Sequence, residues 1–336
     1  MKTTCQPPPA MPVSRTDRTI VAMNGQPYLP RLNAQLAAGL RLVPDDVRTK
    51  HAEFLRSRQN PDGGFSGREG GSDLYYTGFA LRGLSVLDAL DEPTTDRAAR
   101  FLRNSLAREA AVVDFFSLLY ASLIIQTTSG EDVLSDAPAD WPERVSATLE
   151  SFRTADGGYA KGPGGNSGST YHSFLVALCY EVLGRELPEP LRLRDFVLSR
   201  RREDGGFVEM AAMRRAGTNP TAAGVGVLKV LEPLLGPMPE EVRLGVVEFL
   251  AEMPTDEGGL RANGRVPLAD LLSTFTGSWT LSELGALDRL DAARVLNYVD
   301  EVEHPPGGFH GGLWDEGYDV EYTFYGLGTW ALFEGR

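Results

Sequence analysis

Few residues in this sequence have a thiol or imidazole side chain, the groups with the strongest preference for transition metals. They are the two cysteines, Cys5 and Cys179, and the four histidines, His51, His172, His304 and His310. Two cysteines are too few for a disulfide scaffold, a cysteine-rich zinc module or an iron–sulfur ferredoxin. Of the histidines, only His172 stands at the start of a long apolar segment, where its ring can face a cavity. A hydrogen-bonded place in a pocket wall is its simpler role.

Three carboxylates in the last third of the chain have the chemistry to bind a hard cation. Asp270, Asp319 and Glu321 would supply oxygen ligands, but no run of the sequence resembles a dedicated carboxylate cage. Asp270 and Asp319, like Asp73, stand directly before an apolar helical segment or close to its start. An aspartate in that position usually caps the helix by accepting a hydrogen bond from a backbone N–H, which stabilises it by about 1 kcal/mol. Capping is therefore the simpler role for the aspartates.

Composition and charge exclude several classes of protein. The chain has 336 residues, of which 42% are hydrophobic and 24% charged, and can bury a core without metal or disulfides. With a net charge of -13 and no basic block, a nucleic-acid-binding surface is not expected. We also expect no apolar run long enough to cross a bilayer, and the N-terminus lacks the apolar segment of a secretory signal. The sequence thus predicts a cytoplasmic protein without a transmembrane segment.

A Gly-Gly-aromatic or Gly-Gly-Leu triplet recurs at intervals of about 50 residues. The triplets begin at Gly63, Gly157, Gly205, Gly258 and Gly307, so the steps are 94, 48, 53 and 49 residues. Because 94 is about twice 47, a degenerate copy is expected near residue 110. A period of this length is typical of repeat architectures.

Each repeat combines two kinds of helix. An amphipathic segment such as 47–58 or 191–202 precedes the glycine turn, and a mostly apolar segment follows after a loop of roughly ten residues. Six helices that are apolar on nearly every face must be buried, and the amphipathic helices must cover them. These patterns predict an all-α fold, an α/α toroid (α6/α6 barrel) of six helical hairpins. We expect one domain over 31–336, after a Pro-rich and disordered arm over 1–30.

The segment 54–87, which reads FLRSRQNPDGGFSGREGGSDLYYTGFALRGLSVL, resembles the repeat of protein prenyltransferase β subunits and squalene cyclases. Gln59, Gly63, Gly64 and Phe65 match the Q-x-x-x-G-G-F turn of that superfamily. The resemblance extends from about residue 45 to the C-terminus. In its length, its number of hairpins and its final helix, the sequence most resembles the Rab geranylgeranyltransferase β subunit. It implies the toroid fold, but one fold carries many functions.

The resemblance also implies where a zinc ion would lie. In the family, the Asp and Cys of a D-x-C motif and a later His hold zinc, which activates a substrate cysteine to attack a prenyl diphosphate. The matching positions here are Asp270, Leu272 and Tyr322. Leucine has no donor atom, and a tyrosine phenol, with a pKa of about 10, rarely binds zinc. We therefore expect no cofactor, with zinc only if Asp270, Asp319 and Glu321 rebuild a site. The candidate catalytic residues are Asp270, Asp319 and Tyr322.

The family's diphosphate-binding residues are partly present. The position of a family histidine falls near Gly217, and the family's Arg–Lys pair is reduced to Arg265, together with Arg261. Arg214 and Arg215 stand in a preceding loop and can replace lost charge, because arginine binds phosphate bidentately. Arg261 and Arg265 are the candidate diphosphate ligands, and solvated surface arginines are the alternative.

Aromatic residues gather near the starts of the apolar helices. In a toroid these starts converge on one end of a central cavity, where aromatic walls would bury an isoprenoid chain. About half of the aromatic side chains are expected to pack in the core instead. We predict a lipid-binding cavity lined by Tyr76, Phe116, Tyr171, His172, Phe275, Trp279 and Tyr322.

Several functions remain open at this point. The first is binding of an isoprenoid or other lipid chain without zinc-dependent protein prenylation. The second is an active geranylgeranyl or farnesyl transferase with a rebuilt site. The third is a class II terpene cyclase, although the sequence lacks the D-x-D-D motif of those enzymes. The fourth is a non-catalytic protein-interaction scaffold. Since family β subunits work with a helical α subunit, a partner of that kind is also expected.

Overall fold

A computed structural model describes residues 27–106 and 111–334 of the chain. An inner set of helices comprises α4 (Leu74–Val86), α6 (Val112–Ser129), α8 (Thr170–Val182), α10 (Thr218–Leu235), α12 (Leu271–Glu283) and α14 (Val320–Phe333). An outer set comprises α3 (Asp45–Ser57), α5 (Glu92–Ser105), α7 (Trp141–Ser151), α9 (Pro190–Ser199), α11 (Glu240–Ala251) and α13 (Ala292–Glu301). The remaining elements are α2 (Tyr28–Leu40), a short 3-10 helix (Leu287–Arg289) and strands β1 (Phe309–His310) and β2 (Tyr318–Asp319).

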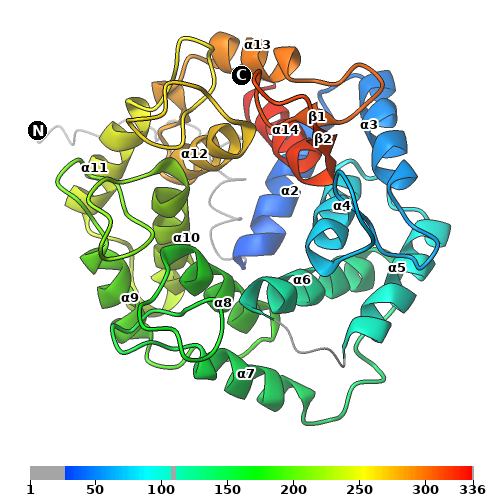
Figure 1. The fold of residues 1–336 in the computed structure, drawn as a ribbon, viewed down its shortest axis with the longest axis horizontal. Helices are drawn as coiled ribbons and strands as arrows, with labels where there is room; N and C mark the ends of the chain where they lie inside the picture. Colours follow the sequence, from blue (N-terminus) through cyan, green and yellow to red (C-terminus); the bar gives the residue numbers. More distant parts are fainter. Residues whose placement is uncertain (1–26, 107–110, 335–336) are drawn as a thin grey trace, which may run out of the picture.

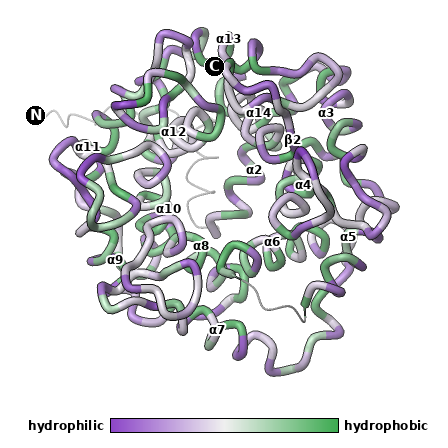
Figure 2. The backbone as a smooth tube through the Cα atoms, in the orientation of Figure 1, coloured by the Kyte–Doolittle hydropathy of each residue, from purple (hydrophilic) through white to green (hydrophobic). Residues whose placement is uncertain are grey.

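The helices form two concentric rings (Figure 1). Each inner helix packs against the next one along the chain, and α14 packs against α4, so that the inner ring is closed. The inner helices are largely hydrophobic, whereas the outer loops are hydrophilic (Figure 2). Each outer helix precedes an inner helix, which gives six hairpins from α3–α4 to α13–α14. The predicted α/α toroid is therefore confirmed.

Polar side chains cap four of the inner helices. The carboxylates of Asp73, Asp270 and Asp319 accept hydrogen bonds from backbone N–H groups in the first turns of α4, α12 and α14. The hydroxyl of Ser169 does the same for α8. The capping role predicted for the three aspartates is thus confirmed.

Each glycine turn lies between the two helices of a hairpin and packs against the outer helix of the next hairpin. Gly63 has φ +94°, and a Cβ atom there would lie 2.0 Å from the carbonyl oxygen of Arg97 on α5. Gly205 and Gly258 make equally close approaches to α11 and α13. Glycine is required because it accepts a positive φ and leaves room for the neighbouring backbone. After the turn, a backbone N–H donates to a hydroxyl on the following inner helix at 2.9 Å, in the pairs Phe65–Thr77, Tyr159–Ser173, Phe207–Thr221 and Leu260–Thr274.

The last glycine turn closes the ring by packing on α3. A Cβ atom at Gly307 would lie 2.8 Å from the carbonyl oxygen of Lys50. Nearby, His51 is fully buried, and its Nδ1 accepts a hydrogen bond from the N–H of Gly308 at 3.1 Å. Its Nε2 lies 2.9 Å from Oε1 of Glu303. Burial lowers the pKa of His51, so this histidine joins the first and last repeats as a neutral ring.

Helix α2 departs from the predicted domain boundary. Tyr28, Leu29 and Pro30, which lie within the predicted arm, form the first turn of α2. Proline is compatible with a first helical turn, so Pro30 does not interrupt the helix. The α2 helix runs inside the ring beside α14 and α4 (Figure 1). Residues 1–26 of the predicted arm, with Cys5, lie outside the described residues.

The second hairpin contains a long apolar helix, α6. The expected degenerate repeat copy falls on residues 107–110, outside the described residues, but α5 and α6 supply the hairpin itself. Helix α6 has 18 residues and is apolar enough to cross a membrane by length and composition, contrary to our prediction. It is also an inner helix, packed between α4 and α8, with 56% of its residues buried. A place in the core of a toroid accounts for its composition.

Candidate functional site

The inner ring encloses a cavity of about 510 Å³. Its wall follows a regular pattern: each inner helix presents the side chains at its second, fifth and sixth positions, except that α4 has Gly78 at the fifth. Helix α12, for example, contributes Leu272, Phe275 and Thr276, and also Trp279 at its ninth position. This spacing corresponds to one face of an α-helix. The six helices therefore each turn one face towards the axis of the ring.

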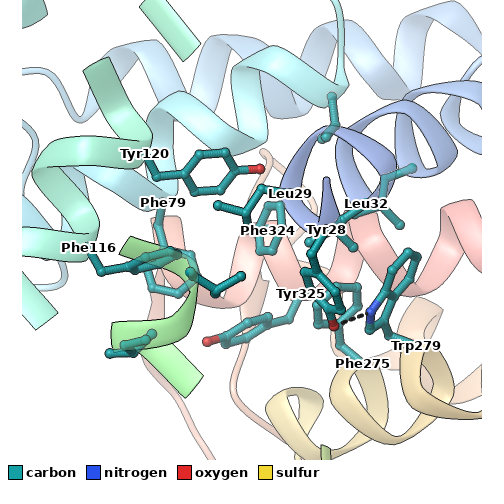
Figure 3. Close-up of a cluster of buried hydrophobic side chains, with 14 of the residues drawn as sticks. Tyr28, Leu29, Leu32, Phe79, Phe116, Tyr120, Phe275, Trp279, Phe324 and Tyr325 are labelled. Carbon is teal, nitrogen blue, oxygen red and sulfur yellow. Dashed lines mark hydrogen bonds between the residues drawn. The ribbon is translucent and has the colours of Figure 1, made fainter. Parts of the chain in front are cut away.

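Helix α2 forms the floor of the cavity. Leu29 and Leu32 face the cavity, and the Tyr28 hydroxyl accepts a hydrogen bond from Nε1 of Trp279 at 2.7 Å (Figure 3). The Tyr28 ring also packs edge-on against Phe174, with centroids 5.4 Å apart. The wall extends from the second to the ninth helical positions, which corresponds to about 10 Å along the axis. The mouth lies at the N-terminal ends of the inner helices.

The structure places four of the seven predicted cavity residues on the wall: Phe116, Tyr171, Phe275 and Trp279. The other three, Tyr76, His172 and Tyr322, do not line it, and this placement is corrected. All three stand at the third position of their helices. Successive residues in a helix are 100° apart, so these three side chains are turned aside from the cavity that second-position side chains face; of the third-position residues of the inner helices, Pro220 of α10 alone lies on the wall. The wall has Tyr75, Phe79, Phe174, Phe324 and Tyr325 in addition.

The histidines do not contribute to the cavity. His172 is half-buried, and its Nδ1 has no hydrogen-bond partner among the residues that the structure describes. Burial, assisted by Lys161, lowers the pKa of His172. His304 stacks on Tyr318 with ring centroids 3.8 Å apart, and His310 packs edge-on against the same tyrosine.

Glu321 and Arg82 are two of the three charged side chains on the cavity wall, and Glu209 is the third. Glu321, at the second position of α14, accepts hydrogen bonds from the hydroxyls of Tyr75 at 2.6 Å and Tyr325 at 3.2 Å. Burial raises the pKa of Glu321 above its usual value. Arg82, at the ninth position of α4, is only 9% exposed and lies against the ring of Phe79. Neither was among the predicted cavity residues, although an arginine within an all-apolar helix was a signal available in the sequence.

The residues at the family's zinc position do not fit the metal. Both carboxylate oxygens of Asp270 accept hydrogen bonds from Ser273, at 2.6 Å from its backbone N–H and 2.8 Å from its hydroxyl. The Leu272 side chain lies on the cavity wall and has no donor atom. Burial, with Glu321 nearby, raises the pKa of Tyr322 to about 12, so its phenol stays protonated at neutral pH. Within residues 27–106 and 111–334, no three His, Cys, Asp or Glu side chains are grouped as a metal site.

The alternative carboxylate site is not assembled either. The Asp319 side chain is 4% exposed, and its Oδ2 lies 3.0 Å from Nε of Arg68. Arg68 also binds Asp315 through Nη1, at 2.9 Å. Asp319 is thus neutralised by an arginine, while Glu321 is held by tyrosine hydroxyls. The structure does not bring Asp270, Asp319 and Glu321 together as ligands of one cation.

An open depression of about 790 Å³ adjoins the mouth of the cavity. It shares Glu209, Asn219 and Pro220 with the cavity wall. Arginines 214, 215 and 265 line it, and within the described part of the chain no hydrogen bond or ion pair engages their side chains. Arg261 does not line the depression, because its guanidinium donates to the carbonyl oxygen of Glu252 at 2.8 Å. Of the two predicted diphosphate ligands, only Arg265 is therefore at the mouth.

The sequence matches the prenyltransferase alpha-alpha toroid domain over residues 36–208, 94–260 and 223–335. A curated relative is the protein farnesyltransferase subunit beta of Schizosaccharomyces pombe (strain 972 / ATCC 24843), 27% identical over 199 residues. The match covers 56% of this chain and 50% of the relative, so the chain spans about half the length of the curated relative it matches.

Solved structures with the same fold have different activities. The geranylgeranyltransferase-I of Candida albicans, complexed with GGPP, has a TM-score of 0.68 at 14% identity, over 85% of this chain and 91% of that chain. A type II terpene cyclase from Scytonema, in complex with geranylgeranyl dihydroxybenzoate, has a TM-score of 0.57 at 14% identity, over 91% and 98%. An alpha-1,6-mannanase from Salegentibacter has a TM-score of 0.60 at 12% identity, over 85% and 98%.

At these identities the structural similarity establishes the fold alone. The match to the domain, in contrast, extends over nearly the whole described chain and agrees with the Gly-Gly turns and the closed double ring. The resemblance to prenyltransferase β subunits is thereby confirmed, and this chain belongs to the prenyltransferase alpha-alpha toroid domain family.

Proposed function

We propose that this protein binds an isoprenoid or other lipid chain in the central cavity and does not carry out zinc-dependent protein prenylation. The observation that supports the proposal is the aromatic wall, because every inner helix turns apolar side chains towards one cavity that helix α2 closes at one end. A volume of about 510 Å³ falls within the usual range of small-molecule pockets, about 300 to 1,000 Å³. Aromatic and aliphatic walls bind a hydrocarbon chain by removing its surface from water.

The chemistry of the zinc position supports the second half of the proposal. Thiol activation by zinc requires three protein ligands and one open position. Here both oxygens of Asp270 accept hydrogen bonds from Ser273, Leu272 has no donor and Tyr322 remains a neutral phenol. No other residue in this region replaces the missing ligands, because Arg68 holds Asp319 in an ion pair.

A second candidate function is a prenyl-diphosphate enzyme that uses no zinc. It is favoured by the depression at the mouth, where Arg214, Arg215 and Arg265 could hold a diphosphate while the chain enters the cavity. The relatives solved with GGPP and with geranylgeranyl dihydroxybenzoate bind ligands with such chains. The helical partner inferred from the resemblance and the cytoplasmic location stay predictions.

The proposal can be tested by filling the cavity. Ala223, at the sixth position of α10, lines the cavity and is buried. We expect Ala223→Phe to weaken binding of geranylgeraniol at least about tenfold, measured by native mass spectrometry, because the new ring occupies the space of the chain. Ala293→Phe on the exposed face of α13 is the matched control. Failure of wild-type protein to bind geranylgeraniol, or equal binding by both variants, would contradict lipid binding in this cavity.

A further inference from the structure

Arg82 places a positive charge inside the cavity, whose other charged wall residues are Glu209 and Glu321. It stands at the ninth position of α4, level with Trp279 on α12, whose indole binds Tyr28 of the floor helix. Arg82 is on the cavity wall and is 91% buried, since only 9% of its surface is exposed. An arginine guanidinium is a planar cation whose N–H groups donate hydrogen bonds and accept none.

The guanidinium has little hydrogen bonding of its own. Its Nε donates to the carbonyl oxygen of Gly78, one turn earlier in α4, at 3.2 Å. Within residues 27–106 and 111–334, no hydrogen bond or ion pair engages either terminal nitrogen. Glu209 and Glu321 also line the cavity, but neither forms an ion pair with Arg82 in the described structure. Most of the five donors of this side chain are therefore unused.

Aromatic rings hold the guanidinium in place. Its central carbon lies 3.8 Å from the ring centroid of Phe79 and 5.0 Å from that of Phe324. The rings of Phe116 and Tyr120 are within 6 Å. Cation–π contacts of this kind stabilise the charge but accept no hydrogen bond in the plane of the guanidinium. The fork of N–H groups, which matches a carboxylate bidentately, is left for another acceptor.

We propose that Arg82 is an anion-binding subsite, and that the natural ligand of this cavity is a lipid carboxylic acid whose head group enters first and binds the guanidinium inside the cavity. This inference depends on the proposed lipid-binding function and specifies its ligand. A carboxylate carries one negative charge and two coplanar acceptor oxygens, which match a single guanidinium. A diphosphate brings more charge than one arginine balances inside the cavity, so it suits the three arginines at the mouth rather than Arg82.

Three ligands that carry the same isoprenoid chain distinguish the contribution of the head group to binding from that of the chain. They are geranylgeranoic acid, geranylgeraniol and geranylgeranyl diphosphate, each titrated into the full-length protein and followed by native mass spectrometry. For wild type we expect the acid to bind at least about tenfold more tightly than the alcohol. For Arg82→Met, which keeps an unbranched side chain in the wall, we expect that preference to disappear while the alcohol binds within about threefold of wild type. Arg144→Met, on the exposed face of α7, is the control for loss of an arginine.

Each result has a defined meaning. Equal binding of acid and alcohol by wild type would overturn the Arg82 subsite but leave the lipid cavity intact, whereas binding of none of the three would overturn both. A preference for the acid that persists in Arg82→Met, or that is lost in Arg265→Met instead, would place the head group at the mouth and contradict the proposal. Arg82→Lys keeps the positive charge but lacks the paired N–H groups of a guanidinium, so it should retain part of the preference for the acid over the alcohol. The test therefore does not depend on whether Arg82→Met folds.

Discussion

The guanidinium of Arg68 and the carboxylate of Asp319 form an ion pair across the junction of the first and last repeats, with Nε and Oδ2 3.0 Å apart. Asp319 also caps α14, because its Oδ1 accepts a hydrogen bond from the N–H of Tyr322 at 3.0 Å. Both oxygens of this buried carboxylate are thus engaged. A carboxylate neutralised in this way serves to close the ring rather than to bind a metal ion.

Loss of the arginine should therefore destabilise the closed ring. We expect Arg68→Met to lower the free energy of unfolding by about 2 kcal/mol, less than for a fully buried pair because Arg68 is partly exposed. Urea-induced unfolding provides the measurement. Arg289→Met is the matched control, since Arg289 pairs with Glu248 at the surface and should contribute less. Equal losses for the two variants would show that the Arg68–Asp319 pair has no special role.

Two glycines with nearly the same φ angle allow the contribution of the close packing between repeats to the free energy of unfolding to be measured. Gly63 and Gly70 have φ +94° and +93°, but a Cβ atom at Gly63 would lie 2.0 Å from a backbone oxygen, whereas Gly70 has open space. We expect Gly70→Ala to reduce the free energy of unfolding by about 1 to 2 kcal/mol, the cost of a left-handed alanine. Gly63→Ala should cost at least about 3 kcal/mol because helix α5 must also move. Similar values for both would contradict the packing of the turn on α5.

The buried carboxyl group of Glu321 predicts a specific dependence of stability on pH. Burial raises its pKa in the folded state, so above that pKa the folded protein carries a buried negative charge that the unfolded chain exposes to water. This destabilising contribution is fully present above the folded-state pKa of Glu321. It disappears as the pH falls through the folded pKa towards the unfolded value of about 4.3.

Glu321→Gln should consequently be more stable than wild type at pH 7, and the difference should shrink as the pH approaches 4. Urea unfolding at several pH values measures both quantities. Gln can still accept the hydrogen bonds of Tyr75 and Tyr325 through its amide oxygen. A difference that is constant with pH would indicate that the charge of Glu321 is not responsible.

The absence of zinc ligands can be tested by restoring them. We expect the double variant Leu272→Cys/Tyr322→His, with Asp270, to raise the zinc retained after dialysis from near zero to about one ion per chain, because three protein ligands are then present. Leu272→Cys alone is the control and should retain little zinc, since it has only two of the ligands. Elemental analysis of the three proteins decides between these outcomes. Zinc retained by wild type at one ion per chain would overturn the description of this position.

The fold was predictable because its signals are repeated. The Gly-Gly turn beginning at Gly63 recurs with a period near 50 residues, and six apolar segments require burial by their amphipathic neighbours. Helix α2 was missed although Leu29, Leu32, Leu36 and Leu40 are spaced as one helical face, because prolines around its start were interpreted as an arm. Position in sequence gave no indication that this helix lies inside the ring.

The site was only partly predictable because its residues depend on helix phase. Tyr171 and His172, or Glu321 and Tyr322, are neighbours in sequence, yet only the first of each pair faces the cavity. An error of one residue in a helix rotates a side chain by 100°, and the boundaries of these helices were not fixed by the sequence to that precision. Arg82 was missed for a different reason, since its role follows from rings on α4, α6 and α14 that only the closed fold brings together.

The central claim, lipid binding without zinc-dependent transfer, is tested most directly by one intact-mass experiment. Wild-type protein is incubated with a cysteine-containing peptide and either geranylgeraniol or geranylgeranyl diphosphate, with and without zinc, and all species are weighed by native mass spectrometry. The account predicts a one-to-one complex of protein and geranylgeranyl chain that forms without zinc, and a peptide whose mass never changes. Zinc-dependent addition of a geranylgeranyl group to the peptide would contradict it.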